Sequence, residues 1–224
     1  MYKRARKWIL LPIPLLVVGC ISQESPVLHD TSCEPPCWHE IEPGITNQQE
    51  LIDILINDPM VDPKTISSHG EQWKGFNDIV YFHLKSGEEV RVYLLEDKVS
   101  MISFYDNLRL SFGQTIDQFG EPKKIIVFNM YGPAFLFGEA LHTIVHAIEP
   151  EKGISYEGDF TGISIEKPFK ISPSTKIDEF EFFDPDSYLQ LLEQGMFSDV
   201  GLEGSRTLEL VQEWKGYGEY KSIK

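Results

Sequence analysis

The sequence predicts an α+β fold, built of tandem helix-plus-antiparallel-meander units with a C-terminal helical segment. Three similar stretches support this prediction. Each has an aliphatic residue, then a Ser or Thr that can cap a helix, then apolar residues five and eight positions after that cap. The caps are Thr46, Ser111 and Ser172, which are 65 and 61 residues apart. Regular recurrence of this kind indicates a repeated supersecondary unit.

The second stretch, residues 110–122, has helix signals at both ends. Ser111 and Gln114 have the spacing of a capping box. Gly120 stands where a left-handed C-cap is expected, and Pro122 prevents the helix from continuing. This stretch therefore predicts one short, well-bounded helix.

The other two stretches are interpreted in the same way. Thr46 and Gln49 predict a capping box at the start of a first helix. Ser172 followed by Pro173 predicts the first turn of a third helix. Asp184 predicts the cap of a further short helix in the C-terminal part.

Alternating and β-branched apolar runs predict the strands between these helices. They cover residues 79–84, 90–95 and 99–104 in the first unit, and 124–130, 141–148, 154–156 and 162–166 in the second. Glu96 and Asp97 predict a tight hairpin turn. The segment 204–214 is ambiguous between helix and strand.

Residues 1–19 predict a secretory signal, with a basic head followed by an apolar run too short to span a bilayer. The run ends in Val17-Val18-Gly19-Cys20, which resembles the lipobox of bacterial lipoproteins. The resemblance implies that Cys20 becomes the mature N-terminus, with diacylglycerol on its thiol and a further acyl chain such as palmitate on its amine. More than one chain gives stable anchoring. The expected location is therefore the cell membrane or the outer membrane, facing outside the cytoplasm.

The expected organisation follows from these signals. Residues 20–32 are a flexible tether, 33–107 a first unit, 108–170 a second unit and 171–224 a C-terminal helical unit, with 33–224 forming one compact body. Cys33 and Cys37 remain as a pair once Cys20 carries lipid, which predicts a disulfide outside the cytoplasm. The alternative is a redox or metal site, for which the spacing fits neither the C-x-x-C motif nor a zinc finger.

The net charge of −15 limits the classes of partner. Without residues 1–19, 16 basic residues remain against 35 acidic ones, a net charge of −19. Such a surface repels phosphate backbones and argues against nucleic-acid binding.

No catalytic, nucleotide-binding or metal-binding motif is found in the sequence, so we expect a protein that is not an enzyme and carries no cofactor or metal. His142 and His146 are placed on one strand, too far apart to share a metal, whereas a helix would bring them together. Asp184 and Asp186 resemble the start of a calcium loop, but helix capping explains them as well.

Four aromatic residues, Trp38, Trp73, Trp214 and Tyr217, together with Tyr220, form a candidate binding surface, since Trp and Tyr are favoured at interfaces. The alternative is that they fill the core.

The phrase Pro43-Gly44-Ile45-Thr46 with Gln49, Leu51, Leu55, Pro59 and Asp62 resembles the opening of small outer-membrane lipoproteins of the BamE/SmpA type. The tandem arrangement is similar to the beta-lactamase inhibitor proteins. The resemblance implies a helical hairpin on an antiparallel sheet and a role in binding other proteins. We therefore expect a lipid-anchored binding or envelope-assembly module with another envelope protein as partner. The alternatives are a cell-surface solute or glycan binder and an unrecognised hydrolase.

Overall fold

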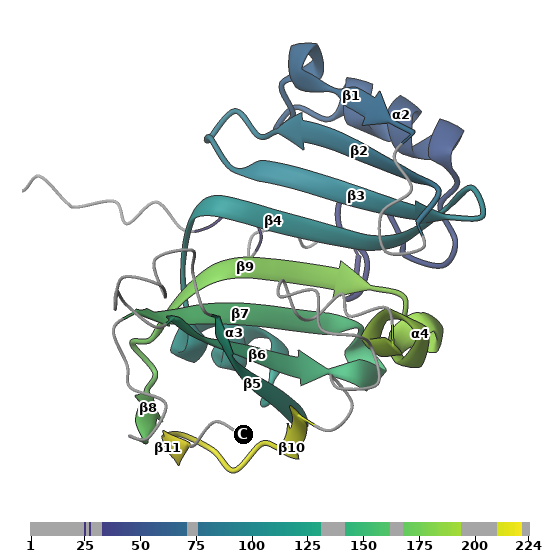
Figure 1. Cartoon of the computed structure of the whole chain (residues 1–224). Helices are drawn as coiled ribbons and strands as arrows, with labels where there is room; N and C mark the ends of the chain where they lie inside the picture. The colour runs from purple at the N-terminus through teal and green to yellow at the C-terminus, as the bar shows by residue number, and fades with distance from the viewer. Residues whose placement is uncertain are drawn as a thin grey trace, which may run out of the picture.

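The structure is a computed structural model that describes residues 25, 27, 33–70, 76–130, 142–161, 168–193 and 210–220. Its main feature is one nine-stranded antiparallel sheet with the strand order β1-β2-β3-β4-β9-β7-β6-β5-β10 (Figure 1). A second, two-stranded sheet pairs β11 with β8. The strands are β1 (Ser67–His69), β2 (Asp78–His83), β3 (Glu89–Leu95), β4 (Lys98–Ser111), β5 (Lys124–Met130), β6 (His142–Glu149), β7 (Ile154–Thr161), β8 (Phe169–Ile171), β9 (Lys176–Phe183), β10 (Val211–Glu213) and β11 (Gly218–Tyr220).

The predicted α+β repeat is wrong. The chain is mostly β, and its described α-helices are the short α2 (Gln48–Asn57), α3 (Phe112–Phe119) and α4 (Tyr188–Glu193). The predicted meanders do not form separate units, because β9 pairs with β4 on one side and with β7 on the other. Strands from both predicted units therefore belong to one sheet.

The third predicted repeat fails at Ser172. Residues 172–175 form a turn, closed by a bond from the Thr175 amide to the Ser172 carbonyl, and β9 follows at Lys176. Phe180 and Phe182 belong to the core on one face of the sheet, and the buried Glu179 and Glu181 alternate with them along the strand. This alternation is that of a central strand, with both faces covered.

The predicted helix at Ser111 is confirmed, and the predicted cap at Thr46 is one residue early. Ser111 accepts a bond from the Gln114 amide at 3.3 Å and is the N-cap of α3. In α2 the N-cap is Asn47, which forms a reciprocal capping box with Glu50. The side chain of Thr46 instead accepts a bond from the Glu42 amide at 2.8 Å.

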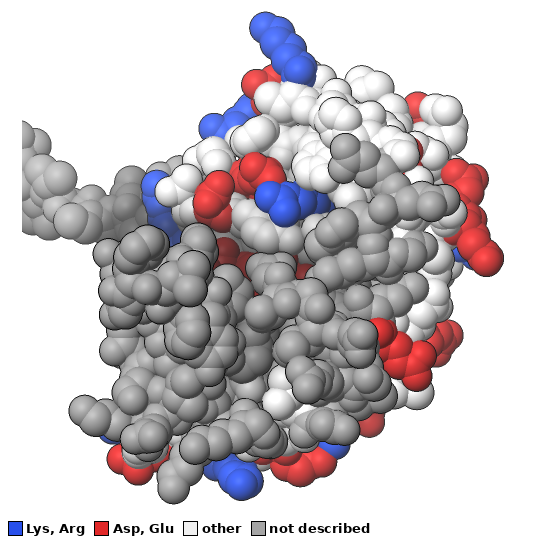
Figure 2. Space-filling view, viewed as in Figure 1, with Lys and Arg blue, Asp and Glu red and all other residues white. Residues whose placement is uncertain are grey.

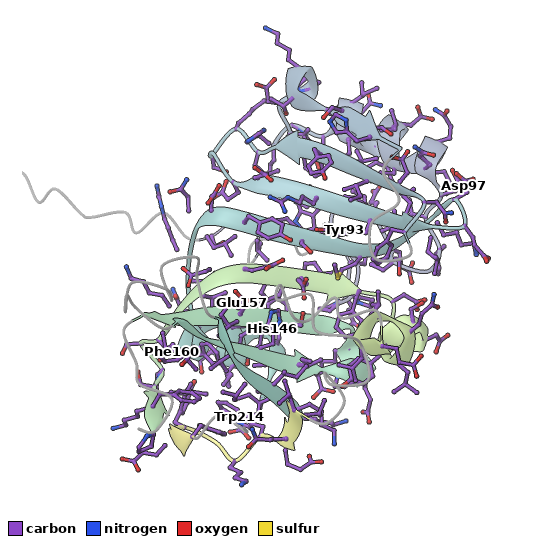
Figure 3. All side chains as sticks on the ribbon, viewed as in Figure 1. Tyr93, Asp97, His146, Glu157, Phe160 and Trp214 are labelled. Atoms are coloured by element: carbon purple, nitrogen blue, oxygen red, sulfur yellow. A yellow bond between two sulfur atoms is a disulfide. The ribbon has the colours of Figure 1, made fainter. Side chains whose placement is uncertain are left out.

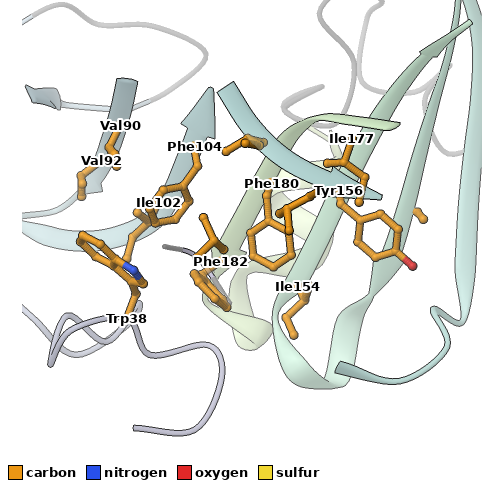
Figure 4. Close-up of a cluster of buried hydrophobic side chains, with 14 of the residues drawn as sticks. Trp38, Val90, Val92, Ile102, Phe104, Ile154, Tyr156, Ile177, Phe180 and Phe182 are labelled. Atoms are coloured by element: carbon orange, nitrogen blue, oxygen red, sulfur yellow. The ribbon is translucent and has the colours of Figure 1, made fainter. Parts of the chain in front are cut away.

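The core lies on both faces of the sheet. On one face, α2 and α3 cover a large cluster in which aromatic and aliphatic side chains of β3, β4, β7 and β9 pack together (Figure 4). On the other face, Leu191 and Leu192 of α4 pack with Phe183, Tyr93 and Met101. Short 3-10 turns, η1 (Pro63–Thr65), η3 (Pro150–Lys152) and η4 (Pro185–Ser187), connect the elements. Asp184 caps η4, immediately before α4.

Two described residues of the predicted tether pack on the body. Ser25 and Val27 are buried, and Val27 belongs to the main core cluster. In the predicted ambiguous segment, Val211–Glu213 is the edge strand β10. No described helix has both the length and the apolar character needed to cross a membrane.

Candidate functional site

The predicted site residues fall in different places. Cys20 and Trp73 lie outside the described residues. Cys33 and Cys37 are bonded to each other, which agrees with the predicted disulfide. Trp38 is fully buried and packs against Phe82 and Phe104, so its assignment to a binding surface is wrong.

The disulfide and the buried Trp38 position a turn at the surface. Trp38 and Ile41 exchange backbone hydrogen bonds of 2.9 and 2.8 Å, so His39 and Glu40 are the two residues of a tight hairpin turn. Their φ angles are 47° and 68°, in the left-handed region that side chains other than Gly rarely adopt. Positive φ at both central residues is the usual geometry of a two-residue hairpin turn, and the Glu96–Asp97 turn has it as well.

The turn faces the C-terminal end of α2 across an open depression of about 510 Å³. The depression is lined by His39, Glu40, Asp53, Ile54, Asn57, Asp58 and Pro59. His39 closes one side, because its Nδ1 donates to the Asp58 carboxylate at 2.5 Å. Glu40 and Asp53 are exposed, which leaves two carboxylates facing solvent at the margin.

An exposed aliphatic residue lies beside this depression. Ile56 of α2 is 55% exposed, between the lining residues Ile54 and Asn57. We call the depression together with Ile56 the α2 depression. It combines acidic groups with apolar surface on a rigid helix, an arrangement that suits a ligand with positive charge and an apolar side chain.

A band of polar side chains crosses the face of the large sheet that lies opposite the main core cluster. Strand register places it in two adjacent rows: Tyr105, Glu179, Glu157 and His146 in one, and Arg91, Ser103, Glu181 and Ser155 in the other. We call these eight residues the polar band. Figure 3 labels His146 and Glu157 on this part of the sheet.

Side chains of the polar band pair with one another. His146 Nε2 pairs with the Glu157 carboxylate. Ser103 Oγ donates to Glu181 at 3.1 Å, and Ser155 Oγ donates to the other oxygen of the same carboxyl. Burial raises the pKa of the Glu181 carboxyl above its usual range. Burial, and then the charge of Glu179, raises the pKa of the Tyr105 phenol.

Arg91 completes the band near its edge. Its guanidinium lies 4.2 Å from the centre of the Tyr105 ring, and its Nε donates to Glu89 at 2.7 Å. The hydroxyls of Tyr93 and Tyr105 lie 3.2 Å apart. These contacts give the band the character of a structural network.

The structure bears on the two possible metal sites, at His142 with His146 and at Asp184 with Asp186. His142 and His146 both belong to strand β6, as predicted. The side chain of Asp184 accepts a bond from the Asp186 amide, as expected for a capping residue. Within the described ranges, no group of three or more His, Cys, Asp or Glu side chains is arranged to hold a metal ion.

Two of the predicted aromatic residues do lie together. Trp214 and Tyr217 have ring centres 5.9 Å apart, and Tyr217 is 40% exposed. Figure 3 places Trp214 between β10 and β11. The sequence offered a signal for this pair in its short spacing. It offered none for the α2 depression, because the depression forms only where the turn at residues 39–40 packs against the end of α2 at residues 53–59.

The surface charge is predominantly acidic, as the composition requires. Figure 2 shows acidic side chains at the right-hand margin, where Figure 3 labels Asp97 in the β3–β4 turn.

Comparison of the chain with family models, with curated proteins and with solved structures finds no match.

Proposed function

We propose that this protein is a lipid-anchored, extracytoplasmic binding module that is not an enzyme and that takes another envelope protein as its partner. The observation that carries the binding role is the α2 depression, with its exposed acids and the exposed Ile56. The expected partner presents a basic segment with an apolar side chain, because charge complementarity steers association and apolar contact adds affinity.

The local construction supports binding without a large rearrangement. The disulfide, the buried Trp38 and the His39–Asp58 bond fix one wall of the depression. The other wall is a capped helix that is packed on the core through Leu51 and Leu55. Preorganised walls reduce the entropy lost on association.

The anchor rests on the lipobox resemblance, and the disulfide supports the location, since disulfides persist outside the cytoplasm. The anchor is tested by mass spectrometry of the protein purified from its native membrane. We expect an N-terminal peptide that begins at Cys20 and carries the mass of diacylglycerol and an amide-linked acyl chain. An unmodified Cys20 thiol contradicts the anchor and leaves the binding proposal standing.

The partner is tested by photo-cross-linking from the full chain in its native membrane. A photoreactive amino acid replaces Ile56, and in a control it replaces Leu189, which is 63% exposed on α4. We expect a discrete adduct from position 56 alone, to an extracytoplasmic protein whose cross-linked segment is basic. Adducts that are equal at both positions, or absent at position 56, contradict the proposal.

A further inference from the structure

We infer that a second site, formed by aromatic side chains between α3 and the segment that joins β10 to β11, binds a neutral carbohydrate. This inference goes beyond the proposed protein partner and does not depend on it. The site consists of Phe112, Tyr156, Trp214, Tyr217 and Tyr220, which we call the aromatic corner.

The aromatic corner is a continuous set of ring contacts. The ring of Phe112 lies 4.9 Å from Tyr156, edge to face, and 6.4 Å from Trp214 in a stacked arrangement. Trp214 in turn lies 5.7 Å from Tyr220 and 5.9 Å from Tyr217. The corner therefore extends from the buried Tyr156 to the exposed Tyr217.

The position of Phe112 depends on a glycine in the sheet. A Cβ at Gly158 of β7 would lie 3.1 Å from the Phe112 ring and 2.9 Å from the Lys176 carbonyl oxygen. Gly158 thus lets the first residue of α3 approach the sheet closely. The position of Phe112 is therefore set by the packing of α3 on β7 and not by the C-terminal segment.

Three polar atoms at the corner have no hydrogen-bond partner among the described residues. They are the Tyr156 hydroxyl, the Trp214 indole N–H and the Thr115 hydroxyl. Tyr156 and Thr115 are almost wholly buried, and Thr115 follows Phe112 by three residues on the buried side of α3. In Figure 4 the Tyr156 hydroxyl points away from the other labelled side chains of the cluster. Buried polar groups in native proteins nearly always have partners, and a polar ligand at the corner would satisfy these atoms.

Acidic side chains of α3 and of the segment after it act electrostatically on the same rings. Burial raises the pKa of the Tyr217 phenol, and the charges of Asp117 and Glu121 raise it further. The charge of Glu121 also acts on Tyr156 and Tyr220. The charge of one carboxylate therefore acts on three members of the corner.

These features select the class of ligand. Aromatic faces provide flat apolar surface, the Trp214 N–H needs an acceptor, and Asp117 and Glu121 accept hydrogen bonds. A sugar has C–H faces, acceptor oxygens and donor hydroxyls, and so satisfies all three. A quaternary ammonium group suits aromatic faces but has no acceptor for the N–H. An anion is repelled by the carboxylates.

The accessible end of the corner suits an oligosaccharide. Gly216 and Gly218 flank Tyr217, and a Cβ at either position would have no described neighbour within 4 Å. The Tyr217 side chain itself is 40% exposed, and the Tyr220 hydroxyl donates to the Gly216 carbonyl at 2.7 Å, which fixes the loop. A fixed loop with one exposed ring gives a preformed stacking platform.

The test uses the full chain in a polyoxyethylene detergent, which contains no sugar. Chitotetraose and maltohexaose are titrated in turn up to about 10 mM, with tryptophan fluorescence and calorimetry as readouts. We expect a saturable response to at least one of them. Tyr217→Ala weakens that response by roughly five- to tenfold through loss of stacking. Tyr81→Ala, at the other end of the sheet, is the matched control and leaves the response unchanged.

A second variant separates a ligand site from a purely structural cluster. Tyr156→Phe removes a buried hydroxyl that lacks a partner, so it raises the melting temperature in either case. If the corner binds sugar through this hydroxyl, the same variant also weakens binding by about fivefold. A raised melting temperature with unchanged sugar binding overturns the inference.

Two other outcomes also overturn it. One is the lack of a saturable response to either oligosaccharide. The other is a response to tetramethylammonium that exceeds both sugar responses, which assigns the corner to cations. The protein partner is judged separately, because the α2 depression and the aromatic corner share no residue.

Discussion

Glu157 and Glu179 stand directly opposite each other across strands β7 and β9, in the middle of the sheet. Like charges in this relationship destabilise a sheet. Here each carboxylate has a neighbour in the same row, since His146 pairs with Glu157 and Tyr105 bonds with Glu179. The polar band is therefore held together by cross-strand pairs.

Replacement of Glu181 by Gln tests how this band affects stability. Burial raises the folded-state pKa of Glu181 above its unfolded value, so its contribution is fully present below the unfolded pKa and is lost as pH rises through the folded pKa. We expect Glu181→Gln to be more stable than the natural protein at neutral pH and to lose less stability as pH rises.

Urea unfolding at a series of pH values from about 4 to 8 measures this difference. Glu219→Gln is the control, because Glu219 is exposed on β11 and its replacement leaves the pH profile unchanged. A Glu181→Gln variant that is less stable at every pH contradicts the account of a destabilising buried carboxyl.

Trp38 belongs to the core and not to the predicted binding surface, and a substitution can test this. Because its ring is fully buried against Phe82 and Phe104, Trp38→Ala removes core contacts and leaves a cavity. We expect a loss of about 3–5 kcal/mol in the free energy of unfolding. Ile45→Ala, at a residue that is 62% exposed, changes it by less than about 0.5 kcal/mol.

The position of the α2 cap can be tested in the same way. Asn47 accepts a bond from the Glu50 amide at 3.0 Å, and the Glu50 side chain bonds back to the Asn47 amide. Asn47→Ala therefore costs about 1 kcal/mol in thermal or denaturant unfolding. Gln49→Ala, at the residue that the sequence predicts as the capping partner, has an effect below about 0.5 kcal/mol.

The Cys33–Cys37 disulfide closes a short loop before the buried Trp38. Replacing both cysteines with Ser removes this constraint from the unfolded chain, and we expect a loss of about 2 kcal/mol. Reducing agent lowers the melting temperature of the natural protein and leaves the double variant unaffected. Equal melting temperatures of the natural protein with and without reductant contradict the structural role.

Local signals in the sequence predict the elements well and their arrangement poorly. The Ser111 cap and the strands around β2, β3, β5 and β6 depend on neighbours within a few residues, and they lie where the sequence places them. The false repeat at Ser172 has the same local signals, but the segment pairs with β4 and β7, which are distant in sequence. Periodicity does not report such long-range pairing, and tertiary context overrides a weak helix signal.

The candidate sites also differ in whether local sequence or long-range contacts determine them. The pairing of Cys33 with Cys37 follows from chain spacing and compartment, whereas the α2 depression needs the turn at His39 to meet the end of α2. Trp38 and Trp214 have similar chemistry, yet one is core and the other lies near the surface. Sequence alone gives no measure of burial for a single aromatic residue.

The most direct test of the binding role reverses charge at the α2 depression. Glu40 and Asp97 both occupy the second position of a tight turn, with φ angles of 68° and 67°. Glu40→Lys and Asp97→Lys are therefore matched in backbone strain, and only the first changes the depression. With the photoreactive group at position 56, we expect that Glu40→Lys abolishes the adduct and that Asp97→Lys retains it. Equal adduct yields from the two variants rule out binding of a basic partner at the α2 depression.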